Sequence, residues 1–311
     1  MTWSPDRLAA GFETQSVAGS RPGEPGTLVR RRGGPNVSPR AVMLWLHGFS
    51  DYFFQTHVAD HLAEHGIGFH ALDLHGHGRS LRAGQTPNQW RSPDEFDTEI
   101  SRAVDLISAD TDLPVVVAGH STGGLIAAAW AARTKPVRLA GLVLDSPFLA
   151  PPVPALAERI PRLLAGLLGR ARPDAVVPRG GERAYGRTIH ADADGEWDYD
   201  LSVKPHGGFP IRAGWLGSVL RSQRYLEAVG LSDTPVLLLR SSHHAATATG
   251  FTGGDLVLDP EAMSRAASAM FVRLDTVVIE NGYHDVFLSP EPGRTAALEA
   301  TSRWLDTLLA S

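Results

Sequence analysis

The stretch V-V-V-A-G-H-S-T-G-G at residues 115–124 holds the first candidate for chemistry. A β-branched run ends at Gly119, Ser121 follows, and two further glycines precede a segment of helical composition. In this G-x-S-x-G pattern a serine occupies a sharp turn between a strand and a helix, and its hydroxyl stands clear of the sheet. A Cβ at Gly119 or Gly123 would collide with the neighbouring strand or helix. The N–H of Thr122, left unpaired at the helix N-terminus, would face a developing oxyanion.

A serine hydroxyl is a poor nucleophile until a base removes its proton, and the base needs a carboxylate to fix its tautomer. His284 follows the last predicted strand, residues 276–280, which agrees with the chain order Ser…Asp…His expected for this turn. Asp255 and Asp259 both follow the preceding predicted strand, residues 234–240. On chain order alone, either aspartate qualifies as the acid.

Acyl transfer also needs a second N–H donor for the oxyanion, because Thr122 supplies only one. The loop after an earlier buried strand is the usual source of that donor. The apolar strand at residues 41–46 runs into H-G-F-S-D, so we assign the second donor to the backbone N–H of Phe49. We also assign five residues to the substrate site: His47, Gly48, His120, Leu163 and Leu167.

Strands alternate with helices along the chain, and this order requires a largely parallel sheet with helices on both faces. An antiparallel hairpin at one sheet edge is predicted from residues 11–18 and 27–32. Further strands are predicted at residues 41–46, 68–74, 115–120, 139–144, 234–240 and 276–280. Helices are predicted at residues 55–66, 92–109, from 122, from about 261, and 292–309.

Residues 150–225 differ in character, since they are rich in proline, arginine and glycine and hold no clear buried strand. We interpret them as a helical lid inserted between residues 1–149 and 226–311 of one α/β core. Within the lid, residues 154–168 place leucines on one side and arginines on the other. We expect this segment to cover the pocket, with weak contact to a membrane surface as the alternative.

The composition excludes several classes of protein. The 311 residues include no cysteine, which excludes disulfides, thiolate metal sites and a cysteine nucleophile. A net charge of −5 argues against a nucleic-acid partner, and no apolar run reaches the length of a membrane span. The N-terminus lacks the pattern of a signal peptide, so we expect a cytoplasmic location.

Two polar stretches are weak candidates for a metal site. The acidic stretch at residues 192–200 fails the calcium-loop spacing. His57, His61 and His65 share one helix face without an obvious carboxylate partner. We expect both stretches to be solvated and predict neither metal nor cofactor.

Four motifs and a late aspartate together resemble the monoacylglycerol lipase and lysophospholipase group of α/β-hydrolases: H-G-F-S at 47–50, D-L-H-G-H-G-R-S at 73–80, G-H-S-T-G-G at 119–124 and G-Y-H-D at 282–285. The similarity covers the chain from about Ala41 to its end except the lid. It implies an α/β-hydrolase fold and a D-x-x-x-D motif whose first aspartate, here Asp255, is the triad acid. The long loop at residues 241–254 departs from that pattern.

The resemblance and the residues together predict a serine hydrolase that cleaves carboxylic esters. Its expected substrate is a small-molecule ester with an apolar acyl chain, similar to a monoacylglycerol or lysophospholipid. An amide or C–C bond hydrolase similar to proline iminopeptidases is the enzymatic alternative, because it shares the triad. A non-catalytic protein that keeps the pocket for ligand binding is the alternative from another class.

Overall fold

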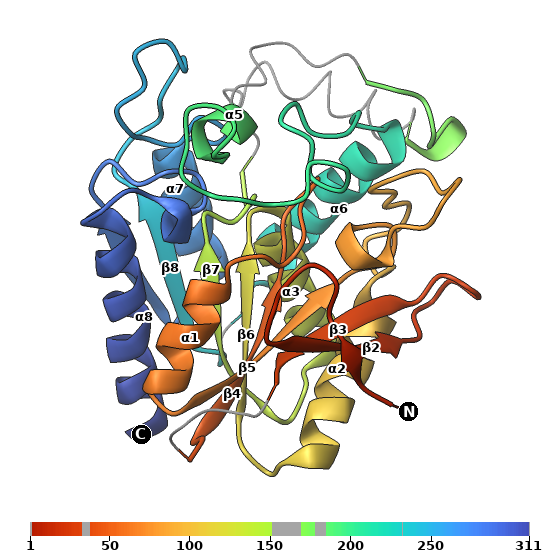
Figure 1. Ribbon diagram of the computed structural model, residues 1–311, viewed down its shortest axis with the longest axis vertical. Coiled ribbons are helices and arrows are strands. Elements are labelled where there is room, and N and C mark those ends of the chain that lie inside the picture. The colour runs from red at the N-terminus through yellow and green to blue at the C-terminus, as the bar shows by residue number, and fades with distance from the viewer. Residues whose placement is uncertain (1, 33–37, 151–168, 178–184, 232, 311) are drawn as a thin grey trace.

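The computed structural model describes residues 2–32, 38–150, 169–177, 185–231 and 233–310 (Figure 1). The described strands form one sheet of nine in the order β1-β2-β3-β5-β4-β6-β7-β8-β9. Their bounds are β1 Ser4–Pro5, β2 Phe12–Val17, β3 Gly26–Arg31, β4 Ala41–Leu46, β5 Ile67–Asp73, β6 Val115–His120, β7 Leu139–Asp145, β8 Val236–Ser241 and β9 Leu274–Ile279. The described helices are α1 Thr56–Glu64, α2 Asp97–Asp110, α3 Thr122–Thr134, α5 Tyr185–Ile189, α6 Ala213–Val229, α7 Pro260–Met270 and α8 Gly293–Ala310, with short 3₁₀ turns η1 Gly78–Ser80 and η2 Val286–Leu288.

The sheet is antiparallel from β1 to β5 and parallel from β5 to β9. Every residue of β4, β6 and β8 is buried, as expected for parallel strands that are covered on both faces. The predicted edge hairpin and largely parallel sheet are therefore confirmed. Parallel strands end at one edge of the sheet, so the loops after β4, β6, β8 and β9 gather there.

Helices cover both faces of the sheet, as the alternating pattern predicts (Figure 1). Helices α1 and α8 pack on one face, and α2, α3, α6 and α7 contribute to the apolar core on the other. Helix α3 is buried along residues 122–132, where small side chains allow close packing against the sheet. None of the described helices is long and apolar enough to cross a membrane.

Helix α2 begins at Asp97, so the predicted start at Ser92 is wrong. Residues 92–96 form turns, because the carboxylate of Glu95 accepts hydrogen bonds from the backbone N–H groups of Arg91 and Ser92. The same carboxylate contacts His75 Nε2 at 3.0 Å. A tertiary contact therefore holds this segment in a tight turn, whereas Pro93 alone had indicated the start of a helix here.

The prediction of a solvated histidine stripe on α1 is wrong for two of its three members. His57 Nε2 lies 2.9 Å from the carbonyl oxygen of Phe287, and its ring stacks on Trp197. His61 Nε2 lies 2.8 Å from Ser302 Oγ on α8. His65 is exposed, as expected. The helix face that carries His57 and His61 packs against neighbouring elements, which sequence spacing by itself does not reveal.

The predicted lid is described only in part. Residues 154–168, with Leu163 and Leu167, lie outside the described residues, so their role stays a prediction. Helix α5 lies above the carboxyl ends of the strands (Figure 1). Helix α6 packs on α3 and runs through residue 225, the predicted end of the lid. The division of the chain at residues 150 and 225 remains a prediction.

Candidate active site

Ser121 occupies the corner between β6 and α3 with φ 53° and ψ −117°. A positive φ is strained for a non-glycine residue and persists only where the surroundings impose it. The N–H of Ser121 donates to the carbonyl of Asp145 at 2.9 Å, and the carbonyl of Ser121 accepts from the N–H of Phe148 at 2.9 Å. A Cβ at Gly119 would lie 2.6 Å from the backbone of Gly123, and one at Gly123 would lie 2.3 Å from the carbonyl oxygen of His47. Both glycines are therefore required sterically, as the motif predicts.

The structure brings Ser121, His284 and Asp255 into one hydrogen-bonded chain. His284 Nε2 lies 2.9 Å from Ser121 Oγ, and His284 Nδ1 lies 2.9 Å from Asp255 Oδ2. The other carboxylate oxygen of Asp255 accepts from the N–H groups of Val257 at 2.7 Å and Leu258 at 2.8 Å. Because Nδ1 faces a carboxylate, it carries the proton, and Nε2 presents its lone pair to the serine hydroxyl.

Asp259, the alternative acid, serves a different purpose. It is the N-cap of α7, where its Oδ1 accepts from the N–H groups of Glu261 at 2.9 Å and Ala262 at 3.2 Å. The loop at residues 241–254 instead directs Asp255 inward, since the Asp255 N–H donates to the carbonyl of His243 at 2.9 Å. Of the two aspartates, Asp255 is the one that contacts His284.

The two predicted oxyanion donors lie beside the serine. Phe49 and Thr122 line the same cleft, and within the described part of the chain neither backbone N–H makes a hydrogen bond. Thr122 is the first residue of α3, where an N–H has no partner inside the helix. A Cβ at Gly48 would lie 3.2 Å from Ser121 Cβ, so the loop after β4 approaches the serine closely. This arrangement can place two donors on one oxyanion.

Two of the predicted substrate residues are tied to the main chain or to a buried acid. His47 Nε2 accepts from the N–H of Leu74 at 3.0 Å, and its Nδ1 donates to the carbonyl of Gly48 at 2.8 Å. Both His47 and Gly48 line the cleft. His120 is not among the described residues that line the cleft: its Nδ1 lies 3.0 Å from Asp145 Oδ2, and its ring packs edge-on against that of His284 with centroids 4.9 Å apart.

A buried group of charges that sequence reasoning missed lies beneath the triad. Asp145 Oδ1 accepts from the N–H of Val286 at 3.2 Å, and Asp285 Oδ2 accepts from Gln55 Nε2 at 2.9 Å. Burial and the nearby Asp285 carboxylate raise the pKa of Asp145. Burial alone lowers the pKa of His120, but the carboxylates of Asp145 and Asp285 raise it above its ordinary value. Asp145 is the last residue of β7 and Asp285 directly follows His284, and these positions are the signal that could have identified both aspartates.

The loop that carries Phe49 is held by a distant segment of the chain. Lys204 Nζ lies 2.5 Å from Asp51 Oδ1, and both side chains are buried. Burial alone raises the pKa of Asp51, but the Lys204 ammonium lowers it below its usual value. Tyr52 OH accepts from the N–H of Asp200 at 2.9 Å. The segment around residues 200–204 therefore fixes the loop that supplies the predicted second donor.

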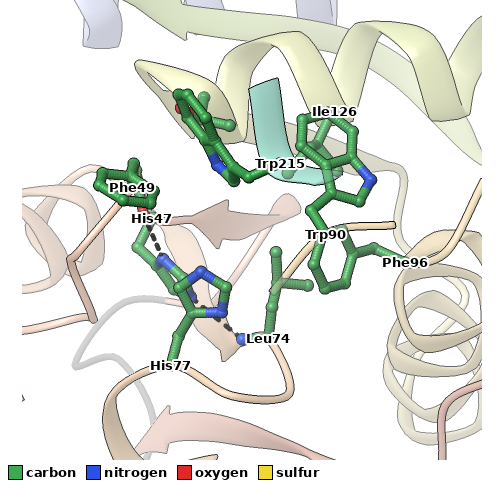
Figure 2. A pocket seen from close by; sticks show the side chains of 10 residues that line it. His47, Phe49, Leu74, His77, Trp90, Phe96, Ile126 and Trp215 are labelled. Atoms are coloured by element: carbon green, nitrogen blue, oxygen red, sulfur yellow. Dashed lines mark hydrogen bonds between the residues drawn. The ribbon is translucent and has the colours of Figure 1, made fainter. Parts of the chain in front are cut away.

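A narrow cleft with a largely apolar lining opens beside Phe49 and Thr122. Figure 2 shows Trp215 and Ile126 on one side of the cleft and Leu74 and His77 on the other. The ring centroids of Phe49 and Trp215 lie 4.5 Å apart. None of the ten described residues that line the cleft carries a carboxylate. This lining suits an apolar group of a ligand.

The contacts of His75, in the glycine-rich loop after β5, lead us to expect that the free energy of unfolding depends on pH. His75 is buried, with Nδ1 2.8 Å from Glu99 Oε1 and Nε2 3.0 Å from Glu95 Oε1. Burial alone lowers the pKa of His75, but the two glutamates raise it to about 9. A histidine whose pKa is higher in the folded state than in the unfolded state stabilises the fold. This contribution is complete below the unfolded-state pKa of about 6.5 and is lost as the pH rises through the folded-state pKa.

We therefore expect the free energy of unfolding to fall by about 2 kcal/mol between pH 7 and pH 9. Urea unfolding at pH 7, 8 and 9 measures this change. The His75→Gln variant should be less stable than the wild type at pH 7, and its free energy of unfolding should change little between pH 7 and pH 9. Parallel curves for the wild type and the variant would contradict this assignment.

The chain matches the family described as serine aminopeptidase, S33, over residues 37–291. It is 33% identical over 227 residues to the lipase LipV of Mycobacterium tuberculosis, which covers 68% of this chain and 78% of that protein. It is 26% identical over 237 residues, or 75% of this chain, to an uncharacterised abhydrolase domain-containing protein of Dictyostelium discoideum, of which it spans only 24%. A solved structure of a soluble variant of a Saccharomyces cerevisiae monoglyceride lipase, in complex with a substrate analogue, matches with a TM-score of 0.70 at 17% identity, over 94% of each chain.

Proposed function

Because this chain belongs to the serine aminopeptidase S33 family of α/β-hydrolases, we propose that it is a serine hydrolase that cleaves carboxylic esters with an apolar acyl chain. The predicted α/β-hydrolase fold and the resemblance to the monoacylglycerol lipase group are confirmed by the family match and by the lipase relative. A fold of this kind hosts many chemistries, so the proposed activity depends on the site. The observation that carries it is the Ser121–His284–Asp255 chain, with contacts of 2.9 Å at both links.

In the proposed mechanism, Ser121 Oγ attacks the ester carbonyl carbon while His284 Nε2 takes the hydroxyl proton. The Phe49 and Thr122 N–H groups donate to the oxyanion of the tetrahedral intermediate. His284 then gives its proton to the leaving alkoxide, and an acyl-enzyme remains on Ser121. Water attacks the acyl-enzyme ester while His284 again accepts a proton. When the resulting tetrahedral intermediate collapses, His284 returns this proton to Ser121 Oγ, and the carboxylic acid is released.

The apolar cleft supports the assignment of esters rather than aminopeptidase substrates. An aminopeptidase must bind the ammonium group of its substrate, which calls for a carboxylate near the reacting carbonyl. The described lining of the cleft offers none, and the buried carboxylates nearby already have partners: Lys204 for Asp51, His120 for Asp145 and Gln55 for Asp285. The lipase name of the LipV relative points the same way. The hydrogen-bonded serine, histidine and aspartate argue against a non-catalytic binding protein.

A substrate panel tests this function. We expect kcat/KM for nitrophenyl esters and monoacylglycerols to exceed that for prolyl amides by at least about 10²-fold, a difference of about 2.7 kcal/mol in transition-state binding. A fluorophosphonate probe should label Ser121, with heat-denatured protein as the control. Absence of labelling would support the binding-protein alternative, and a preference for prolyl amides would support the aminopeptidase alternative. Contact of residues 154–168 with a membrane, and a cytoplasmic location, remain predictions.

A further inference from the structure

Three side chains outside the active site converge on the segment that follows α5. His190 Nδ1 lies 2.7 Å from Asp192 Oδ1, and His206 Nε2 lies 2.9 Å from the same oxygen. The two imidazole rings are nearly perpendicular, with centroids 5.0 Å apart. His190 is buried, whereas the Asp192 side chain is 54% exposed, so solvent reaches the group from one side.

The outer nitrogen of each imidazole donates to a backbone carbonyl. His190 Nε2 lies 3.0 Å from the carbonyl oxygen of Tyr199, and His206 Nδ1 lies 3.2 Å from that of Gly186. The N–H of Asp192 donates to His190 Nδ1 at 3.1 Å, which identifies this nitrogen as the one with the lone pair. In this tautomer both inner nitrogens face one carboxylate oxygen without a proton between them, and a cation bound there would replace the Asp192 N–H as the partner of His190 Nδ1.

We propose that His190, Asp192 and His206 bind a divalent transition metal, with Zn²⁺ as the preferred ion. Two imidazole nitrogens and one carboxylate are ligands that zinc accepts, and a water molecule completes a tetrahedral set. Histidines that bind zinc commonly donate the other ring N–H to a backbone carbonyl, as both histidines do here. The exposed Asp192 carboxylate can shift to admit the ion.

Protons are the other cations that could occupy the group. Two protonated imidazoles would place two positive charges against one carboxylate, and one of them would be on the buried His190. Burial of a charged group is unfavourable unless it is fully paired. One divalent ion satisfies all three atoms without protonating either ring, so the arrangement favours a metal.

The position of this metal site assigns it a structural role in the lid. Tyr185, at the start of α5, accepts from the N–H of Asp285 at 3.0 Å, and its ring lies edge-on to His284 with centroids 5.5 Å apart. Lys204, two residues before His206, pairs with Asp51 in the loop that carries Phe49. A bound ion would therefore fasten together two lid segments that contact the histidine loop and the oxyanion loop.

Metal titration of tag-free, chelator-treated protein tests this proposal. We expect one Zn²⁺ per chain with a Kd of about 1 µM, weaker than four-ligand structural sites. The melting temperature should rise by about 5 °C at a hundredfold excess over Kd. His206→Ala removes a ligand atom and Asp192→Asn replaces the anionic carboxylate with a neutral amide, so each should weaken binding by at least about 100-fold. Co²⁺ should give the visible absorption of a four-coordinate site in the wild type alone.

His65→Ala is the matched control, because it removes an exposed histidine elsewhere and should leave binding unchanged. Circular dichroism and the metal-free melting temperature establish that Asp192→Asn, the near-isosteric variant, is folded. Zinc binding that survives both ligand variants, or its absence in the folded wild type, would overturn the proposal.

Discussion

Replacing Ser121 with alanine is expected to lower kcat for ester hydrolysis by about 10⁴-fold or more while the fold stays intact. The variant removes the oxygen that would attack the carbonyl and leaves His284 without a proton to accept. Alanine has the same Cβ as serine, so the backbone strain at φ 53° changes little. Among the described residues, the side-chain hydrogen bond that is lost is the one to His284. Steady-state turnover of a nitrophenyl ester and a thermal melt measure the two expectations.

Ser108→Ala on α2 is the matched control, because it removes a serine hydroxyl away from the active site. Its turnover should equal that of the wild type. Near wild-type activity in Ser121→Ala would refute the proposed serine-hydrolase mechanism. Loss of the fold in that variant would instead be visible as a lowered melting temperature.

Asp255→Asn is expected to lower kcat by about 10⁴-fold, with little change in structure. The Asp255 oxygen that accepts from the N–H groups of Val257 and Leu258 would be replaced by the amide oxygen. The amide NH₂ would then face His284 Nδ1 and donate to it. This forces the proton of His284 onto Nε2, where it can no longer accept the serine proton.

Asp259→Asn is the matched control for the acid. Its effect should be confined to the N-cap of α7, where asparagine is nearly as good a cap as aspartate, and kcat should stay within a few fold of the wild type. Measured kcat values for both variants rank the two aspartates. A larger loss in Asp259→Asn would assign the acid to that residue, and equal small losses would place the acid in another loop.

The core of the fold could be predicted from local sequence, because its signals are local. Uninterrupted apolar runs such as residues 41–46 identify strands that are buried on both faces, and the structure has β4 at that position. The start of α2 could not be predicted in this way, because the Glu95 carboxylate that holds the preceding turn also depends on His75, twenty residues earlier. A contact through space decides that boundary.

The sequence by itself determined the turn at Ser121, since a Cβ at Gly119 would collide with the backbone of Gly123, only four residues along the chain. Chain order left Asp255 and Asp259 open and the family resemblance favoured Asp255, but only the tertiary structure shows that Asp255 contacts His284, 29 residues away. The Lys204–Asp51 pair spans 153 residues, and His190 and His206 both meet Asp192 only in the folded chain. Steric limits between residues close in sequence can be inferred from residue order. The partner of a buried charge or of a lone pair depends on which distant segments the fold brings together.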